Sequence, residues 1–154
     1  LLRNCGWDMD KKEFSRILLR ASRKEVIGMA EEAENNHRVT LLKEPAKTMV
    51  MLRVKEPVKQ SIFYLGEMLA SHCVVEVDGV QGAAVMAGDD FEKVRCAAIL
   101  DAVHTGRMKE AKELEGKIRR LGRKQQKKRE TEAAVIRGTK VDFHVMEDGN
   151  GHEA

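Results

Sequence analysis

The chain has 154 residues, of which 42% are hydrophobic, 34% are charged and only 4% are aromatic. This length suits one compact domain with appendages, and no apolar run approaches the roughly 20 residues that a membrane-spanning helix requires. The three cysteines, Cys5, Cys73 and Cys96, are too few and too far apart for a disulfide framework or a paired-cysteine metal site. We therefore expect a cytoplasmic protein that binds no metal.

The net charge of +3 conceals an uneven distribution. Residues 1–106 carry 15 basic and 16 acidic side chains, whereas residues 107–140 carry 13 basic and five acidic ones. Residues 141–154 carry four acids and neither lysine nor arginine. The positive charge thus belongs to one segment, and it is densest in KIRRLGRKQQKKRE at residues 117–130.

Two short helices are predicted near the N-terminus. Phe14, Ile17 and Leu18 recur at helical spacing and form one apolar stripe. Ser22 and Glu25 then form the S-x-x-E pattern, in which each side chain satisfies a free backbone donor at a helix start. We therefore expect a corner between two helices at Ser22.

Two β-prone runs follow, at residues 48–54 and 61–67. The stretch between them contains Pro57, which favours a turn. The two runs are therefore predicted to be neighbouring strands.

In residues 72–77, Cys73, Val75 and Val77 alternate with His72, Val74 and Glu76, as in a half-buried strand. Asp78 and Gly79 follow, a pair that accepts the positive φ values of a tight hairpin turn, and residues 80–88 provide the return strand. We expect an α+β fold in which an antiparallel meander of about four strands packs against helices.

The clearest predicted helix spans residues 89–106, with Asp89 placed as its cap and Gly106 as a left-handed stop. A further helix begins near Met108, and its apolar stripe ends at Leu121. Lys, Arg and Gln side chains follow. The second half of this helix is predicted to project as a long basic extension.

These patterns divide the chain into three parts. Residues 1–106 form the predicted core domain, residues 107–139 the basic helical extension, and residues 140–154 an extended docking segment and tail. In the last part Val141, Phe143 and Val145 alternate with polar residues, and such a strand either binds a partner or returns to the edge of its own sheet.

Five short strings in this order resemble the PhnG family, the small subunit of the bacterial carbon–phosphorus lyase system for phosphonate breakdown. They are TMVMLRV at 48–54, FYLGE at 63–67, CVVEVDGVQGAAVMAGDD at 73–90, CAAILDA at 96–102 and KVDFHVM at 140–146. Each string is weak alone, and the resemblance depends on their order and spacing.

The resemblance implies a role in making α-D-ribose 1-methylphosphonate 5-triphosphate, as a phosphonate oxygen displaces adenine from ATP. It assigns the nucleosidase-type chemistry to a larger subunit, so this chain would be a non-catalytic accessory subunit, inactive alone. ATP and Mg²⁺ would then be substrates of the complex, and this chain alone would bind no cofactor. The resemblance also favours docking of Val141, Asp142, Phe143 and Val145 on the larger subunit, with Phe143 as the anchor.

Neither a P-loop nor a G-x-G-x-x-G motif occurs, so no catalytic residue or nucleotide site of these kinds is predicted. Glu67, after Gly66, is a candidate base or ribose contact, with a strand-ending acid as the alternative. His72 is a candidate substrate or phosphate contact, with a solvent-facing histidine as the alternative. A dyad of His72 with Cys73 is rejected because adjacent strand residues point to opposite faces.

Two candidate metal sites are weak. Residues 89–92, DDFE, resemble a magnesium-binding acidic cluster, but a helix N-terminus favours acids through its dipole. His37, His104, His144 and His152 lack the spacing of a zinc site. No metal ligand is therefore assigned.

The basic segment has three interpretations: a contact with an acidic partner or a polyphosphate, a nucleic-acid arm, or a solvated helix face. Single-strand recognition normally uses aromatic platforms, and no aromatic residue lies between Phe91 and Phe143. The first interpretation is favoured. A small basic nucleic-acid-binding protein is the alternative function.

Overall fold

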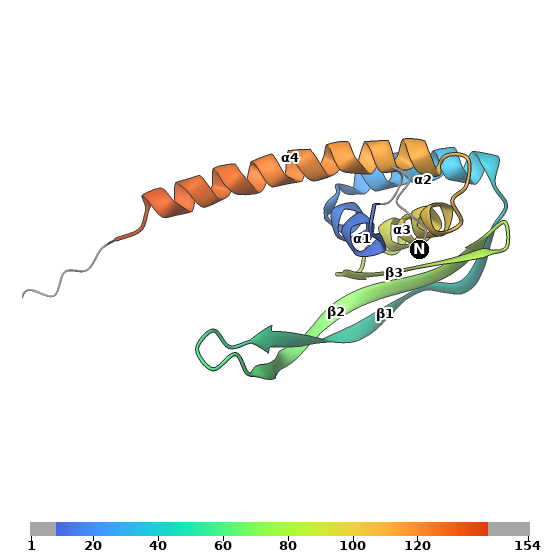
Figure 1. Ribbon diagram of the computed structural model, residues 1–154. Coiled ribbons are helices and arrows are strands. Elements are labelled where there is room, and N and C mark those ends of the chain that lie inside the picture. The colour runs from blue at the N-terminus through green and yellow to red at the C-terminus, as the bar shows by residue number, and fades with distance from the viewer. Residues whose placement is uncertain (1–8, 142–154) are drawn as a thin grey trace, which may run out of the picture.

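The computed structural model describes residues 9–141 of the chain. In this part of the chain helices pack on one face of an antiparallel sheet, which confirms the α+β class (Figure 1). Helix α4 lies outermost, and both α4 and the β1–β2 hairpin extend beyond the body of the domain towards the same side. The elements are α1 (Lys11–Arg20), α2 (Arg23–Asn36), β1 (Val39–Lys55), β2 (Ile62–Val77), β3 (Val80–Ala87), α3 (Phe91–Thr105) and α4 (Ala111–Gly138).

The corner between α1 and α2 is built as predicted. The Glu25 N–H donates to Ser22 Oγ over 3.3 Å, and the Ser22 N–H donates to Glu25 Oε2 over 2.9 Å. These reciprocal bonds satisfy two backbone donors that a helix start leaves free. The hydrogen bond from the Ser22 backbone is the main cause of a lowered Glu25 pKa.

The described sheet has three strands in the order β1-β2-β3, not about four. The predicted strands at residues 61–67 and 72–77 are one strand, β2, because its ladder with β1 runs from Ile62 to Val77. The predicted turn after β2 is confirmed, since Asp78 and Gly79 have φ values of 47° and 84°.

Helix α3 packs directly on the sheet. Cys73, Val75 and Val77 on β2 are fully buried on the face towards this helix. Gly82 on β3 allows the close approach, because a Cβ at this position would lie 2.1 Å from the backbone oxygen of Ala98. A sheet position without a side chain thus brings the helix backbone against the strand.

Both predicted ends of α3 need correction. The cap is Asp90, whose Oδ1 accepts from the Lys93 N–H over 3.0 Å, and Asp89 instead lies 3.8 Å from Lys47 Nζ. Gly106 is right-handed at φ −77°, and Arg107 takes the left-handed conformation at φ 50°. Each signal is displaced by one residue, the usual uncertainty of a helix end.

The first half of helix α4 packs in the core, and its C-terminal half is exposed. Ala111, Leu114 and Ile118 are buried. Contact with α1 continues one turn beyond the predicted limit at Leu121, since Gln125 Nε2 donates to the Ile17 carbonyl over 2.9 Å. From Gln126 onwards every described side chain of the helix is exposed. The division into parts at residues 106 and 139 stays a prediction.

Candidate partner-docking surface

Two strands project from the sheet without a third neighbour. Strand β3 pairs with β2 only from Ala70 to Val77, so residues 62–69 of β2 pair with β1 alone. We call residues 48–55 of β1 and 62–69 of β2 the ribbon. A two-stranded ribbon is marginally stable in water unless one of its faces is covered.

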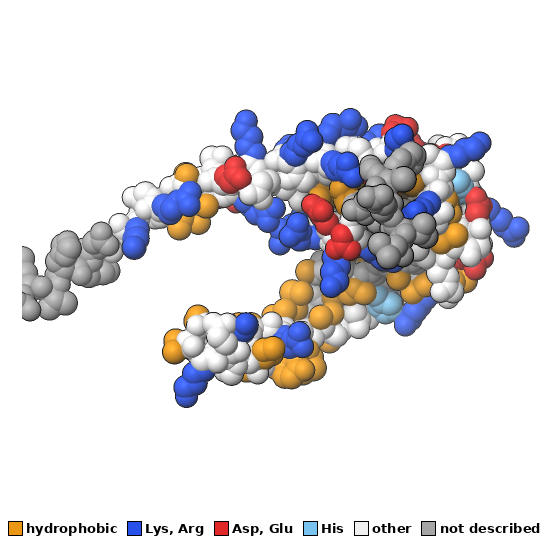
Figure 2. Space-filling view, in the orientation of Figure 1, with side chains coloured by type: hydrophobic (Ala, Val, Ile, Leu, Met, Phe, Trp, Pro, Cys, Tyr) orange, Lys and Arg blue, Asp and Glu red, His pale blue; other side chains and the backbone are white. Residues whose placement is uncertain are grey.

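The ribbon exposes large apolar side chains on both faces. Cross-strand pairing and the alternation of side chains place Met49, Met51 and Leu69 on one face, and Val54 and Phe63 on the other. Figure 2 shows apolar side chains along the ribbon. Contiguous exposed apolar surface of this kind marks interaction sites. The exposed set is Met49, Met51, Val54, Ile62, Phe63, Tyr64, Leu65 and Leu69.

A bulge near the tip adds to this exposure. Leu52 pairs with Gly66 and Arg53 pairs with Tyr64, so Leu65 has no partner in the ladder and is 65% exposed. Gly66 adopts φ 156°, which side-chain-bearing residues rarely adopt, and no heavy atom lies within 4 Å of its virtual Cβ. The bulge therefore explains why residue 66 is a glycine, because no other described segment packs against this position.

The free end of α4 faces the same opening as the ribbon. We call residues 126–138 of α4 the arm. Figure 2 shows lysine and arginine side chains along α4, across a wide opening from the apolar ribbon. The arm also exposes Val135 and Ile136. One border of the opening is thus apolar and the other is mainly cationic.

The structure does not bring the two candidate substrate contacts together. Glu67 is exposed on the ribbon opposite Met51, on the face that carries Met49. His72 lies five residues along β2, about 17 Å away at strand spacing, and on the other face. Both remain predictions as substrate contacts.

His72 is not the solvent-facing histidine that was the alternative. Both of its ring nitrogens are buried and have no hydrogen-bond partner within residues 9–141. Cys73 points to the opposite face, where burial raises the pKa of its thiol. The geometry agrees with rejection of a Cys73–His72 dyad.

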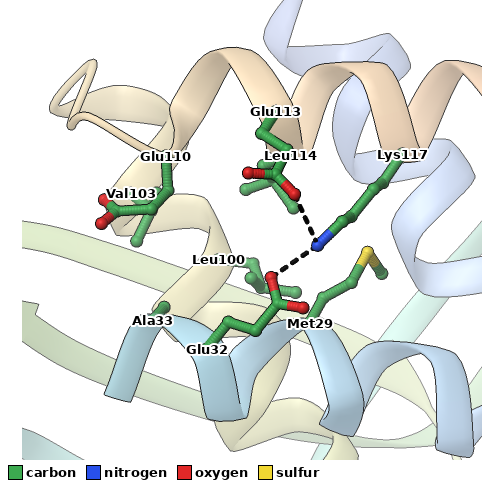
Figure 3. A pocket seen from close by; sticks show the side chains of 9 residues that line it. All are labelled: Met29, Glu32, Ala33, Leu100, Val103, Glu110, Glu113, Leu114 and Lys117. Carbon is green, nitrogen blue, oxygen red and sulfur yellow. Dashed lines mark hydrogen bonds and ion pairs between the residues drawn. The ribbon is translucent and has the colours of Figure 1, made fainter. Parts of the chain in front are cut away.

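A small cavity lies between α2, α3 and α4 (Figure 3). Lys117 Nζ lies 2.5 Å from Glu32 Oε2 and 3.2 Å from Glu113 Oε1, and the hydrogen bond that Lys117 donates to Glu32 is the main cause of a raised Lys117 pKa. The cavity volume is about 20 Å³, room for about one water molecule. The ion pair between Lys117 and Glu32 links α4 with α2, and the cavity beside it is too small for a nucleotide.

The acidic residues at the start of α3 have structural partners. Arg23 forms ion pairs with both Asp90 and Glu92, and Asp90 also caps the helix. Within residues 9–141, no three His, Cys, Asp or Glu side chains are grouped so that they could hold a metal ion. Among the described helices none is long and apolar enough to cross a membrane.

Of the predicted docking segment, the structure describes only Lys140 and Val141, and both are exposed. Asp142, Phe143 and Val145 lie outside the described residues. The ribbon was missed as a docking surface, although its sequence carried a signal. Residues 62–65, IFYL, are four consecutive large apolar residues, and a half-buried strand would alternate.

The chain was compared with known proteins. The model of the family described as "Phosphonate metabolism protein PhnG" matches residues 9–149, which is most of the chain. A comparison with curated proteins gave no match.

Proposed function

The chain belongs to the PhnG family of phosphonate metabolism, and we propose that it is an accessory subunit of a carbon–phosphorus lyase core complex. In this role it supports formation of α-D-ribose 1-methylphosphonate 5-triphosphate from ATP and a phosphonate. The larger nucleosidase-type subunit supplies the chemistry, and ATP and Mg²⁺ enter as substrates of the complex.

The ribbon is the observation that supports an accessory role best. Its two strands expose apolar side chains on both faces, including Phe63 and Tyr64. Burial of apolar surface contributes about 25 cal/mol per Å² to association, so a partner that covers the ribbon stabilises both itself and this chain. A partner subunit provides such a cover permanently.

The polar candidates fit a supporting role better than a catalytic one. Glu67 and His72 lie on opposite faces of β2, so they cannot act together on one bond. The cavity between α2, α3 and α4 that Lys117 and Glu32 line holds about 20 Å³, far below the few hundred Å³ of ordinary ligand pockets. We therefore assign no catalytic step to this chain.

Nucleic-acid binding is the alternative that the basic segment keeps open. Several of its cations already have acidic partners in the chain: Lys117 pairs with Glu32, Lys124 with Glu25 and Lys128 with Glu132. These pairs reduce the charge that is available to neutralise phosphates. The accessory-subunit role accounts for both the ribbon and the family, and nucleic-acid binding accounts for neither.

The test is co-expression with the larger nucleosidase-type subunit, followed by measurement of complex formation and of adenine release from ATP and methylphosphonate. We expect Leu65→Ser with Leu69→Ser, on the ribbon, to prevent assembly and adenine release. The control is Leu41→Ser with Leu42→Ser, two leucines of similar exposure at the other end of β1. Adenine release by the chain alone, or equal assembly of both double variants, would contradict the proposal.

A further inference from the structure

A cleft of about 650 Å³ lies between α1 and α4. In Figure 1 these two helices lie on the side of the body from which the arm and the ribbon extend. The two helices pack closely at Gly122, where a Cβ would lie 2.8 Å from Ile17 Cδ1. Met9 and Ile17 line the cleft and are themselves almost fully buried. The cleft thus has an apolar floor where the two helices meet.

Its walls are mainly cationic. Arg119, Arg123 and Lys127 line the cleft from α4 at intervals of four residues, so successive charges are about 6 Å apart along the helix axis. Arg16 faces them from α1. Arg16, Arg123 and Lys127 form no ion pair within residues 9–141. Arg119 approaches Glu115 only at 3.8 Å.

We propose that this cleft binds an acidic amphipathic helix of the partner subunit, an inference that rests on the proposed function. Acidic side chains at i and i+4 on such a helix repeat at the same interval of about 6 Å as the cations of α4. Its apolar face packs on the aliphatic stems of the arginine and lysine side chains and on the exposed edges of Met9 and Ile17, in the manner of a helix in a groove. The neighbouring ribbon then covers an apolar surface of the same partner.

A phosphate chain fits the cleft less well. None of the lining side chains is aromatic, so bases would find no stacking platform. Arg119, Arg123 and Lys127 follow one another at four-residue intervals along α4, whereas a short polyphosphate requires cations that converge on one point. A helix that carries carboxylates at four-residue intervals beside an apolar strip can pair with these cations one by one.

The experiment compares two triple variants that remove the same charge from α4. The cleft variant is Arg119→Gln, Arg123→Gln and Lys127→Gln. The control is Arg120→Gln, Lys124→Gln and Lys128→Gln, which has the same spacing on the same helix but lies outside the cleft lining. Binding of the purified larger nucleosidase-type subunit to each immobilised full-length chain is measured at low and at high salt.

We expect the cleft variant to bind about tenfold more weakly than the parent chain, and the control to stay within about threefold. The parent's affinity falls with salt because exposed ion pairs are screened, and the cleft variant's affinity falls less. Equal weakening of both variants, or none, would overturn the inference.

A cross-linking measurement identifies the occupant directly. A photo-reactive residue in place of Gln126, which lines the cleft, is expected to cross-link to a helix of the larger subunit that carries acids at i and i+4. Cross-linking to nucleic acid, or to an uncharged segment, would overturn the inference. If the parent chain does not bind the larger subunit at all, the proposed function fails. If it binds and only the cleft experiments fail, the proposed function stands without this contact.

Discussion

The backbone N–H of Ala83 on β3 donates a hydrogen bond of 3.1 Å to Oδ2 of Asp101 on α3. Strand β3 is an edge of the described sheet, so at this position a helix side chain satisfies a donor that no neighbouring strand reaches. The same oxygen lies 3.2 Å from Lys11 Nζ on α1. Asp101, which is almost fully buried, therefore connects the sheet with two helices.

We predict that Asp101→Ala lowers the free energy of unfolding by about 1–3 kcal/mol, because it leaves the Ala83 N–H without an acceptor. Lys11→Ala should cost less than about 1 kcal/mol, since the Lys11 side chain is mainly exposed. Urea denaturation of the two variants measures the difference. Equal costs would show that the ion pair matters and the backbone hydrogen bond does not.

Gly82→Ala is expected to be among the most damaging small substitutions. The added Cβ would lie 2.1 Å from the Ala98 oxygen and 2.5 Å from the Ala102 nitrogen, and backbone atoms cannot turn aside. Overpacking of this kind costs about 3 kcal/mol or more. Gly28→Ala in α2 is the control, because no atom lies within 4 Å there and alanine favours helix by up to about 1 kcal/mol. Thermal melting should move in opposite directions for the two variants.

The helix corner and the hairpin turn could be predicted from the sequence because each depends on residues close together in the chain. Ser22 with Glu25, and Asp78 with Gly79, form their contacts over at most three residues. That the two predicted strands form the single strand β2 could not be predicted, because the residues between them do not alternate between apolar and polar side chains. The continuity of β2 comes from pairing with β1, which is distant in sequence.

The candidate site was harder to predict for a similar reason. The sequence indicated a strand at Phe63, but exposure of both faces follows from the extent of the helices, since the buried residues of β2 begin at Ala70 and none lies in 62–69. The basic segment was visible as a charge run, whereas the cleft depends on the crossing of α1 and α4 at Gly122. Such three-dimensional consequences leave no local pattern in the sequence.

His37 makes stability depend on pH. Its Nδ1 lies 2.6 Å from Asp78 Oδ2 and its Nε2 lies 2.8 Å from Glu110 Oε2, so both ring nitrogens donate when the ring is protonated. The hydrogen bond to Asp78, and then that to Glu110, raises the pKa of His37 above 6.5. A raised folded-state pKa gives stability that is fully present below pH 6.5 and is lost as pH rises through the folded value.

The carboxylates set the other limit of this pH window. Their hydrogen bonds with His37 are the main cause of the lowered pKa values of Asp78 and Glu110, so their contribution is present above the usual 3.8 and 4.5 and is lost as pH falls through the folded values. Melting temperature should therefore fall between pH 6.5 and 8.5 more steeply for the parent chain than for His37→Gln. Parallel profiles for the two proteins would contradict this assignment.

Phe143→Ala tests the docking segment, which the sequence alone predicts. We expect the variant to co-purify poorly with the larger subunit, because truncation of a buried aromatic anchor costs about 2 kcal/mol or more. Circular dichroism and melting of the isolated chain should not change. Unfolding of the variant would instead indicate that the segment is a strand of the domain's own sheet, and unchanged binding would show that Phe143 is no anchor.

The last prediction separates the two halves of α4. Ile118 is fully buried, and Ile118→Ala should cost about 2–5 kcal/mol through lost apolar contact and the cavity left behind. Lys124 and Lys128 are more than three-quarters exposed, and Lys124 approaches Glu25 only at 3.5 Å. Substitution of Lys124, Lys127 and Lys128 by glutamine should therefore change stability by no more than about 0.5 kcal/mol per site.

Urea denaturation of both variants, with helix content followed by circular dichroism, checks this contrast. The Ile118→Ala variant should be less stable and should still unfold in one cooperative transition, since Ile118 belongs to the core that α1, α2 and α3 share. The triple lysine variant should unfold at the parent's midpoint, because within residues 9–141 Gln125 makes the last hydrogen bond between α4 and α1. A triple lysine variant that melts as early as Ile118→Ala would show that the arm packs on the body of the domain, and the opening between arm and ribbon would then be closed in solution.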